Sequence, residues 1–153
     1  MQRPCLLHAT RWVLFFIFIS LWVCACSGKK SAPVKNTATH TPTEAYIISP
    51  SDGQKVSNPV TIQFGLKGMG IAPAGEAIPN TGHFHLLLDE DHLPALDKPM
   101  DAGMHYLHFG RGETEVGLDL SPGEHSLQLI LGDANHFPHN PPLVSKKIKI
   151  IVE

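Results

Sequence analysis

The chain has 153 residues, of which 42% are hydrophobic and 17% are charged, a composition typical of one modest globular domain rather than a disordered chain. From residue 45 onward it carries seven lysines and arginines against thirteen aspartates and glutamates, a net charge of −6 with histidine neutral. This acidic balance argues against nucleic acid and against anionic lipid surfaces as partners.

The first predicted element is an export signal. Residues 1–11 contain Arg3 and Arg11 and no acid, and the apolar run WVLFFIFISLWV fills residues 12–23. A positively charged stretch followed by an apolar run too short to span a bilayer comfortably is the pattern of a signal peptide. We therefore expect residues 1–25 to be removed from the mature protein.

The sequence VCAC that ends this segment resembles a bacterial lipobox, in which the signal is cut before a cysteine whose thiol is then acylated. Cys26 follows the small residue Ala25 and fits this pattern better than Cys24, which follows a bulky residue. The resemblance implies a diacylglycerol and an N-acyl chain, which together anchor a protein stably to a membrane. By analogy with enterobacterial sorting, Ser27 in place of aspartate favours the outer membrane, facing the periplasm. A plain secretory signal with incidental cysteines is the alternative.

The mature chain begins with a tether. Loss of Cys5 and Cys24 with the signal leaves Cys26 as the only cysteine, so no disulfide can form within one chain. Residues 26–44 are rich in serine, threonine, lysine and proline after that cysteine, and they cannot bury enough apolar surface to fold. One domain is then expected over residues 45–153.

Apolar residues recur at every second position in several stretches of this domain. The clearest of these stretches are residues 60–66, 115–120, 126–131 and 147–152. A period of two predicts strands with one buried face, and clusters of proline, glycine and asparagine between them predict turns. About seven short strands in an all-β domain favour an immunoglobulin-like β-sandwich, with a small Greek-key barrel as the alternative.

Two predicted connections are too long to be hairpins. They span residues 65–82 and 89–105, and loops of that length are usually either functional or disordered. Both border the strand TGHFHLLL, residues 81–88. Side chains alternate between the two sides of a strand, so Phe84 is expected to face the core, whereas His83 and His85 share the opposite side.

Histidine pairs are the chief functional signal of the domain. Cα atoms two residues apart on a strand are separated by roughly 6.6 Å, so two such imidazoles can converge on one ion at about 2.0 to 2.1 Å each. Imidazole suits copper and zinc. The predicted metal ligands are the three pairs His83 and His85, His105 and His108, and His136 and His139.

Methionines in the long loops are candidate accessory ligands, because a thioether adds a preference for Cu(I). Met69, Met100 and Met104 lie there, and Met69 and Met104 are the predicted accessory ligands, Met104 because it directly precedes His105. A loop methionine is also a common gap-filler in packing. The histidine pairs can equally form a structural hydrogen-bond network or a pH-responsive cluster, and His125 is expected to be a packed, hydrogen-bonded histidine on the inward face.

No catalytic motif stands out in the sequence. It has no G-x-S-x-G, no H-E-x-x-H and no phosphate-binding glycine loop, so we expect no enzyme activity. The favoured function is a lipid-anchored envelope protein whose domain binds copper or zinc. The alternative is a non-catalytic interaction or scaffold module of the envelope with an unidentified protein partner.

Several blocks of sequence resemble the bacterial family known as domain of unknown function 4399. They are GLKGMGIAPAG, NTGHFHLLLD, LPALDKPM, HFGRGETE, SPGEHSLQLILGD and HFPHNPP, and the similarity covers about residues 46–152. The resemblance implies an exported protein with one β domain, and it places family histidines at His83, His85, His108, His136 and His139. The residue between the first two is frequently histidine in the family, where this sequence has Phe84. The family name assigns no function.

Overall fold

The computed structural model describes residues 42–153, and every regular element among them is a β-strand. The all-β prediction is therefore confirmed for this part of the chain. Within it, no helix is long and apolar enough to cross a membrane. The predicted signal peptide, Cys26 and the tether as far as residue 41 lie outside the described residues.

Nine strands follow one another along the described chain, where the sequence pattern predicted about seven. Two of them, β2 and β4, have only three and two residues, too few for a period to be recognised. The strands are β1 (Glu44–Ser49), β2 (Gln54–Val56), β3 (Val60–Lys67), β4 (Gly70–Ile71), β5 (Thr81–Leu88), β6 (Tyr106–Phe109), β7 (Glu115–Leu118), β8 (Gly123–Gly132) and β9 (Ile148–Val152).

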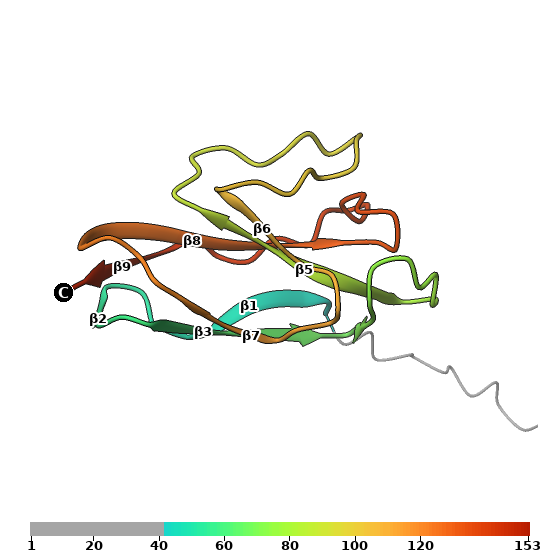
Figure 1. Ribbon diagram of the computed structural model, residues 1–153. Coiled ribbons are helices and arrows are strands. Elements are labelled where there is room, and N and C mark those ends of the chain that lie inside the picture. Colours follow the sequence, from blue (N-terminus) through green and yellow to red (C-terminus); the bar gives the residue numbers. More distant parts are fainter. Residues whose placement is uncertain (1–41) are drawn as a thin grey trace, which may run out of the picture. The chain divides into compact units, whose positions relative to one another are not determined.

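The strands form two layers, which confirms the predicted β-sandwich. The smaller sheet has the order β1-β3-β7, and the larger has the order β2-β9-β8-β5-β4, with β6 also paired to β5. In Figure 1 the smaller sheet is the lower layer and the larger sheet is the upper layer. Strand β5 lies between β8 on one edge and β6 and β4 on the other.

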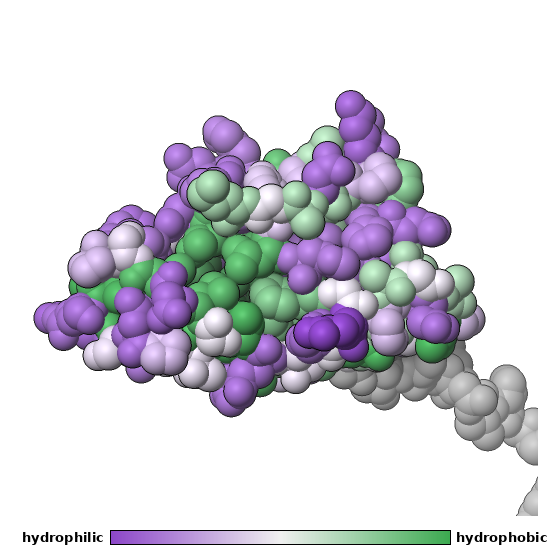
Figure 2. Space-filling model, viewed as in Figure 1, coloured by the Kyte–Doolittle hydropathy of each residue, from purple (hydrophilic) through white to green (hydrophobic). Residues whose placement is uncertain are grey.

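The main core fills the space between the layers. Phe64 of β3 contacts Phe84 of β5 and Phe109 of β6, with ring centroids 5.3 and 4.9 Å apart. Ile62 and Leu129 are fully buried in the same cluster, and each such side chain contributes about 1.5–3 kcal/mol by leaving water. Figure 2 shows hydrophobic surface between the two layers, with hydrophilic residues around it. The alternation read from the sequence thus assigned the inward faces correctly.

Part of the outer face of the larger sheet, over β5 and the end of β8, is also buried. The long connection of residues 89–105 passes over β5 and β6 on the side away from the smaller sheet (Figure 1). Leu87, Met100 and Ile130 form a second, smaller apolar cluster beneath it. His83 and His85, on the same face of β5 as Leu87, have no exposed surface. Alternation predicted which face these histidines occupy, but not that a loop covers it.

Candidate metal centre

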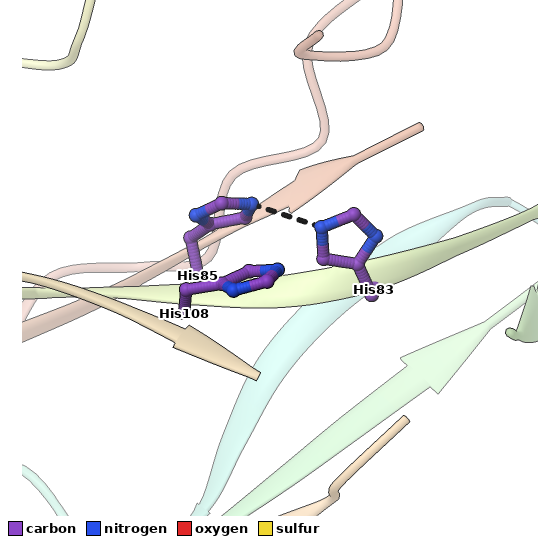
Figure 3. Close-up of side chains that lie close together, drawn as sticks. All are labelled: His83, His85 and His108. Atoms are coloured by element: carbon purple, nitrogen blue, oxygen red, sulfur yellow. Dashed lines mark hydrogen bonds between the residues drawn. The ribbon is translucent and has the colours of Figure 1, made fainter. Parts of the chain in front are cut away.

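Strand register brings three histidines together. His83 and His85 lie on the same face of β5, and the antiparallel pairing of β5 with β6 sets His85 directly opposite His108. Residues directly opposite on neighbouring strands have Cβ atoms about 4.5–5.5 Å apart. One ligand atom from each histidine lies within 4.8 Å of the others, and Figure 3 shows the three rings grouped on the same side of the sheet.

A fourth imidazole comes from the loop between β8 and β9. The ring centroid of His136 lies 4.7 Å from that of His108 and 4.9 Å from that of His83. Its backbone has a φ of 69°, a left-handed conformation that a non-glycine residue adopts at a cost. The carboxylate of Asp133 accepts hydrogen bonds from the backbone N–H groups of Asn135 and Phe137, which holds this loop in the shape that directs His136 toward the strands.

The four rings approach one another through their Nε2 atoms. The Nε2 atoms of His83 and His85 are 3.1 Å apart, and those of His108 and His136 are 3.2 Å apart. Four nitrogens arranged tetrahedrally at 2.0 to 2.1 Å from one ion are about 3.3 Å from one another. Each pair is therefore already at the separation that a shared ion requires.

Two glycines leave room for these rings. A Cβ atom at Gly110 would lie 2.2 Å from Cε1 of His108, and one at Gly132 would lie 3.1 Å from Nε2 of His85. The first distance is far shorter than any van der Waals contact, so alanine at residue 110 would displace the ring of His108. The positions of the histidines thus depend on the absence of neighbouring side chains.

The buried histidines are held in their neutral form. The pKa of His83 is lowered to about 4 and that of His85 to about 3. Burial is the main cause, and the neighbouring histidines add to it. Burial also lowers the pKa of His108. Because metal ions bind the neutral imidazole, these three rings need not lose a proton at neutral pH before binding one.

Two of the ring nitrogens in this cluster lack a hydrogen-bond partner in the described part of the chain. The Nδ1 atoms of His83 and His85 are buried without a hydrogen-bond partner among the described residues. A neutral imidazole carries one N–H and one bare nitrogen. In the hydrogen bond between the two Nε2 atoms, one ring donates its N–H and the other accepts. The donor ring is then left with a bare Nδ1 and the acceptor ring with an Nδ1–H, and neither atom has a partner among the described residues. Each unpaired buried atom costs about 1–3 kcal/mol. Packing rather than hydrogen bonding therefore orients these two rings.

The remaining predicted ligands lie outside the group of His83, His85 and His108, although His139 is close enough to His83 to help lower its pKa. His105 is exposed, and its Nδ1 lies 3.0 Å from the carbonyl oxygen of Leu88. His139 is half-buried, and its Nε2 lies 2.7 Å from the place that a Cβ atom at Gly82 would occupy. Met104 is 86% exposed, whereas Met69 packs against the main core.

Met100 lies beside the cluster, although the sequence did not single it out from the other loop methionines. A Cβ atom at Gly132 would lie 2.9 Å from Cε of Met100 as well as 3.1 Å from Nε2 of His85, so these two side chains share the space beside that glycine. The folding of the loop over the sheet places Met100 there. No periodicity in residues 89–105 indicates it.

A serine, a histidine and an aspartate also meet elsewhere, at the other end of β5 and β8. The Nδ1 of His125 lies 2.7 Å from Oδ2 of Asp89, and its Nε2 lies 2.8 Å from the carbonyl oxygen of Ser121 and 3.4 Å from the hydroxyl. Burial alone would lower the pKa of His125, but the hydrogen bonds to Asp89 and Ser121 raise it above its ordinary value. An imidazole whose two nitrogens both donate cannot accept a serine proton. His125 is buried and hydrogen-bonded, as predicted.

Comparison with known proteins identifies a family but no activity. The chain matches the family described as Domain of unknown function (DUF4399) over residues 62–153. No curated protein matches it. Among solved structures it resembles the endo-beta-1,4-mannanase from Thermotoga petrophila, with 19% identity and a TM-score of 0.41 over 73% of this chain and 20% of the mannanase chain.

Proposed function

The chain belongs to the DUF4399 family, whose name assigns no activity, and from the geometry of its own residues we propose that the domain binds one transition-metal ion, copper or zinc. His83, His85 and His108 are the core ligands, and His136 is the fourth. The observation that carries the proposal is the convergence of His83, His85 and His108, whose ligand atoms all lie within 4.8 Å of one another, with Nε2 of His136 3.2 Å from Nε2 of His108.

A structural hydrogen-bond network is the competing explanation for the same contacts. A network that served stability alone would pair both nitrogens of each ring, whereas the Nδ1 atoms of His83 and His85 have no partner within residues 42–153. Apolar side chains of similar size would fill this space without unpaired atoms. Metal binding of the order of 10 kcal/mol, as in structural zinc sites, would exceed the cost of these two atoms and would explain why histidines occupy a buried face.

The proposed module is non-catalytic and anchored to the cell envelope. Its anchor is the acylated thiol of Cys26, and the support for this is the lipobox resemblance of residues 23–26 together with the apolar run that precedes them. The anchor places the domain on the periplasmic side of the outer membrane. A Cys26→Ser variant is expected to lose acyl labelling and to remain an unprocessed precursor, whereas normal processing and labelling would contradict the anchor.

Native mass spectrometry tests the metal site directly. The whole chain, purified in detergent and stripped of metal, is titrated with Cu(I), Cu(II) and Zn(II). We expect one tightly bound ion in the unmodified chain and none in the His83→Ala/His85→Ala variant. His105→Ala is the matched control, because this histidine is exposed and its loss is expected to leave binding unchanged. Equal binding by the double variant and the unmodified chain would refute the metal site.

A further inference from the structure

Met100 is placed to act on the metal as well as to pack. We propose that its thioether is an additional ligand of the histidine site and that it makes the site selective for Cu(I) over Zn(II). This inference rests on the proposed function, since it names a further ligand and the preferred ion of the same site.

The first support is the position of Met100. It is 4% exposed although it belongs to a long loop whose other residues are mostly exposed. Its side chain reaches the space beside Gly132 that Nε2 of His85 also reaches. Any residue with a Cβ atom at position 132 would displace both groups. The glycine in β8 therefore leaves the space in which Met100 reaches the edge of the cluster.

The second support is a direct tie between the two loops that bear candidate ligands. The backbone N–H of Met100 donates a hydrogen bond of 2.9 Å to the carbonyl oxygen of His136. This contact fixes the loop of residues 89–105 to the loop that carries the fourth imidazole. Met100 and His136 are therefore positioned together, although they are 36 positions apart in the chain.

The third support is access from solvent. A surface cavity of about 220 Å³ is lined by Met100 together with Pro94, Lys98, Pro99 and Tyr106. Met100 thus borders this cavity on one side and the space beside His85 on the other. No histidine among residues 42–153 lines this cavity, so Met100 is the member of the proposed ligand set that borders it.

The charge of the ligand set favours the monovalent ion. The group of residues able to hold a metal contains histidines and no carboxylate among the described residues, and a histidine binds a metal as the neutral imidazole. Burying a charge that no anionic ligand compensates is costly, and the cost rises steeply from one charge to two. A thioether adds no charge and is a soft ligand that prefers Cu(I).

Competition titrations separate a ligand from a packing residue. The whole chain and its Met100→Leu and Met104→Leu variants are titrated with Cu(I) and with Zn(II) against chelators of known affinity. Leucine nearly conserves the volume of methionine and removes only the sulfur. We expect Met100→Leu to lower Cu(I) affinity about tenfold or more, a factor equivalent to roughly 1.4 kcal/mol, and to leave Zn(II) affinity within about twofold. Met104→Leu, at an exposed site, is expected to change neither affinity.

X-ray absorption of the Cu(I)-loaded chain supplies a second readout. We expect a sulfur scatterer beside the nitrogens in the unmodified chain and its loss in Met100→Leu. An unchanged ratio of Cu(I) to Zn(II) affinity in Met100→Leu, or a spectrum with nitrogen ligands alone, would overturn this inference and leave the histidine site standing. Absence of metal binding by the unmodified chain would overturn the proposed function and this inference together.

Discussion

Strand β5 has two buried faces that differ in what they contribute. The face with Phe84 and Leu86 contacts the smaller sheet and belongs to an entirely apolar core. The face with His83 and His85 lies under Met100 and under the loop that carries His136, and it contains buried nitrogens without partners among the described residues. The first face stabilises the fold, whereas the second imposes a cost on it. This difference supports the proposal that the histidine face serves metal binding rather than stability.

The largest effect is expected on the inward face. Phe84→Ala should lower the free energy of unfolding by about 3–5 kcal/mol, because it removes a fully buried ring that packs on Phe64 and leaves a cavity. Urea denaturation of the metal-free chain measures this loss. Ile48→Ala is the control, since Ile48 is 55% exposed and its truncation should change stability by no more than about 0.5 kcal/mol. Similar losses in both variants would contradict the assignment of the core.

Added metal is expected to stabilise the fold through the histidine face of β5 alone. Free metal at a hundredfold excess over Kd should raise the free energy of unfolding by about 2.7 kcal/mol, and a chelator should remove that gain. The Phe84→Ala chain should gain the same amount, because the ring of Phe84 packs in the main core, on the opposite side of β5 from the ligands. Thermal denaturation with and without metal measures both gains. A gain confined to the unmodified chain would show that the two faces are coupled.

Acidification is expected to weaken the metal-free fold through the histidine face. The unfolded chain takes up protons near the ordinary histidine pKa of 6.5, whereas folded His83 and His85 do so only near 4 and 3. The unfolded state therefore binds more protons as the pH falls, and each histidine should cost about 1 kcal/mol of stability between pH 7 and pH 5.5. His125, whose pKa is raised, acts in the opposite direction, because its stabilisation is fully present below 6.5 and is lost as the pH rises through its folded value.

The measurement that isolates this pH effect is a comparison of two proteins. The difference in unfolding free energy between the unmodified chain and a His83→Leu/His85→Leu variant, both metal-free, should change by about 2 kcal/mol over that pH range. His125 is common to both proteins and cancels. A difference that stays constant with pH would mean that the two rings are accessible to protons in the folded state.

The smallest effect is expected from a single added methyl group. Gly110→Ala places a Cβ atom where the ring of His108 now lies, so it should displace one ligand while His83 and His85 stay in place. Metal affinity should fall about tenfold, within the range that perturbed ligand positioning usually costs. Chelator competition measures the change. Gly103→Ala is the control, because a Cβ atom there would meet nothing within 4 Å.

The sequence predicted the elements of the fold better than the composition of the site. The period of two in β3, β5, β8 and β9 identified their inward faces, because a strand must alternate sides. The same period placed His83 and His85 together. It could not predict their complete burial, since the loop that covers them has no periodic pattern.

The residues that join His83 and His85 in the site could be identified only from the tertiary structure. His108 joins the site because the register of β5 and β6 sets it opposite His85, and sequence spacing did not distinguish it from its neighbour His105. His136 is directed inward by a left-handed backbone and the hydrogen bonds of Asp133. Met100 reaches the cluster only through the course of a long loop. Register, turn geometry and loop folding are properties of the assembled domain, and alternation alone does not encode them.

The central claim is that the histidine face binds metal at the expense of stability. The most direct test measures unfolding and metal binding of the His83→Leu/His85→Leu variant in one set of samples at pH 7. We predict no bound metal and a metal-free stability equal to or above that of the unmodified chain, because two apolar side chains replace a pair with unpaired nitrogens. Retained metal binding, or a loss of more than about 2 kcal/mol of metal-free stability, would contradict the claim and identify the histidines as structural.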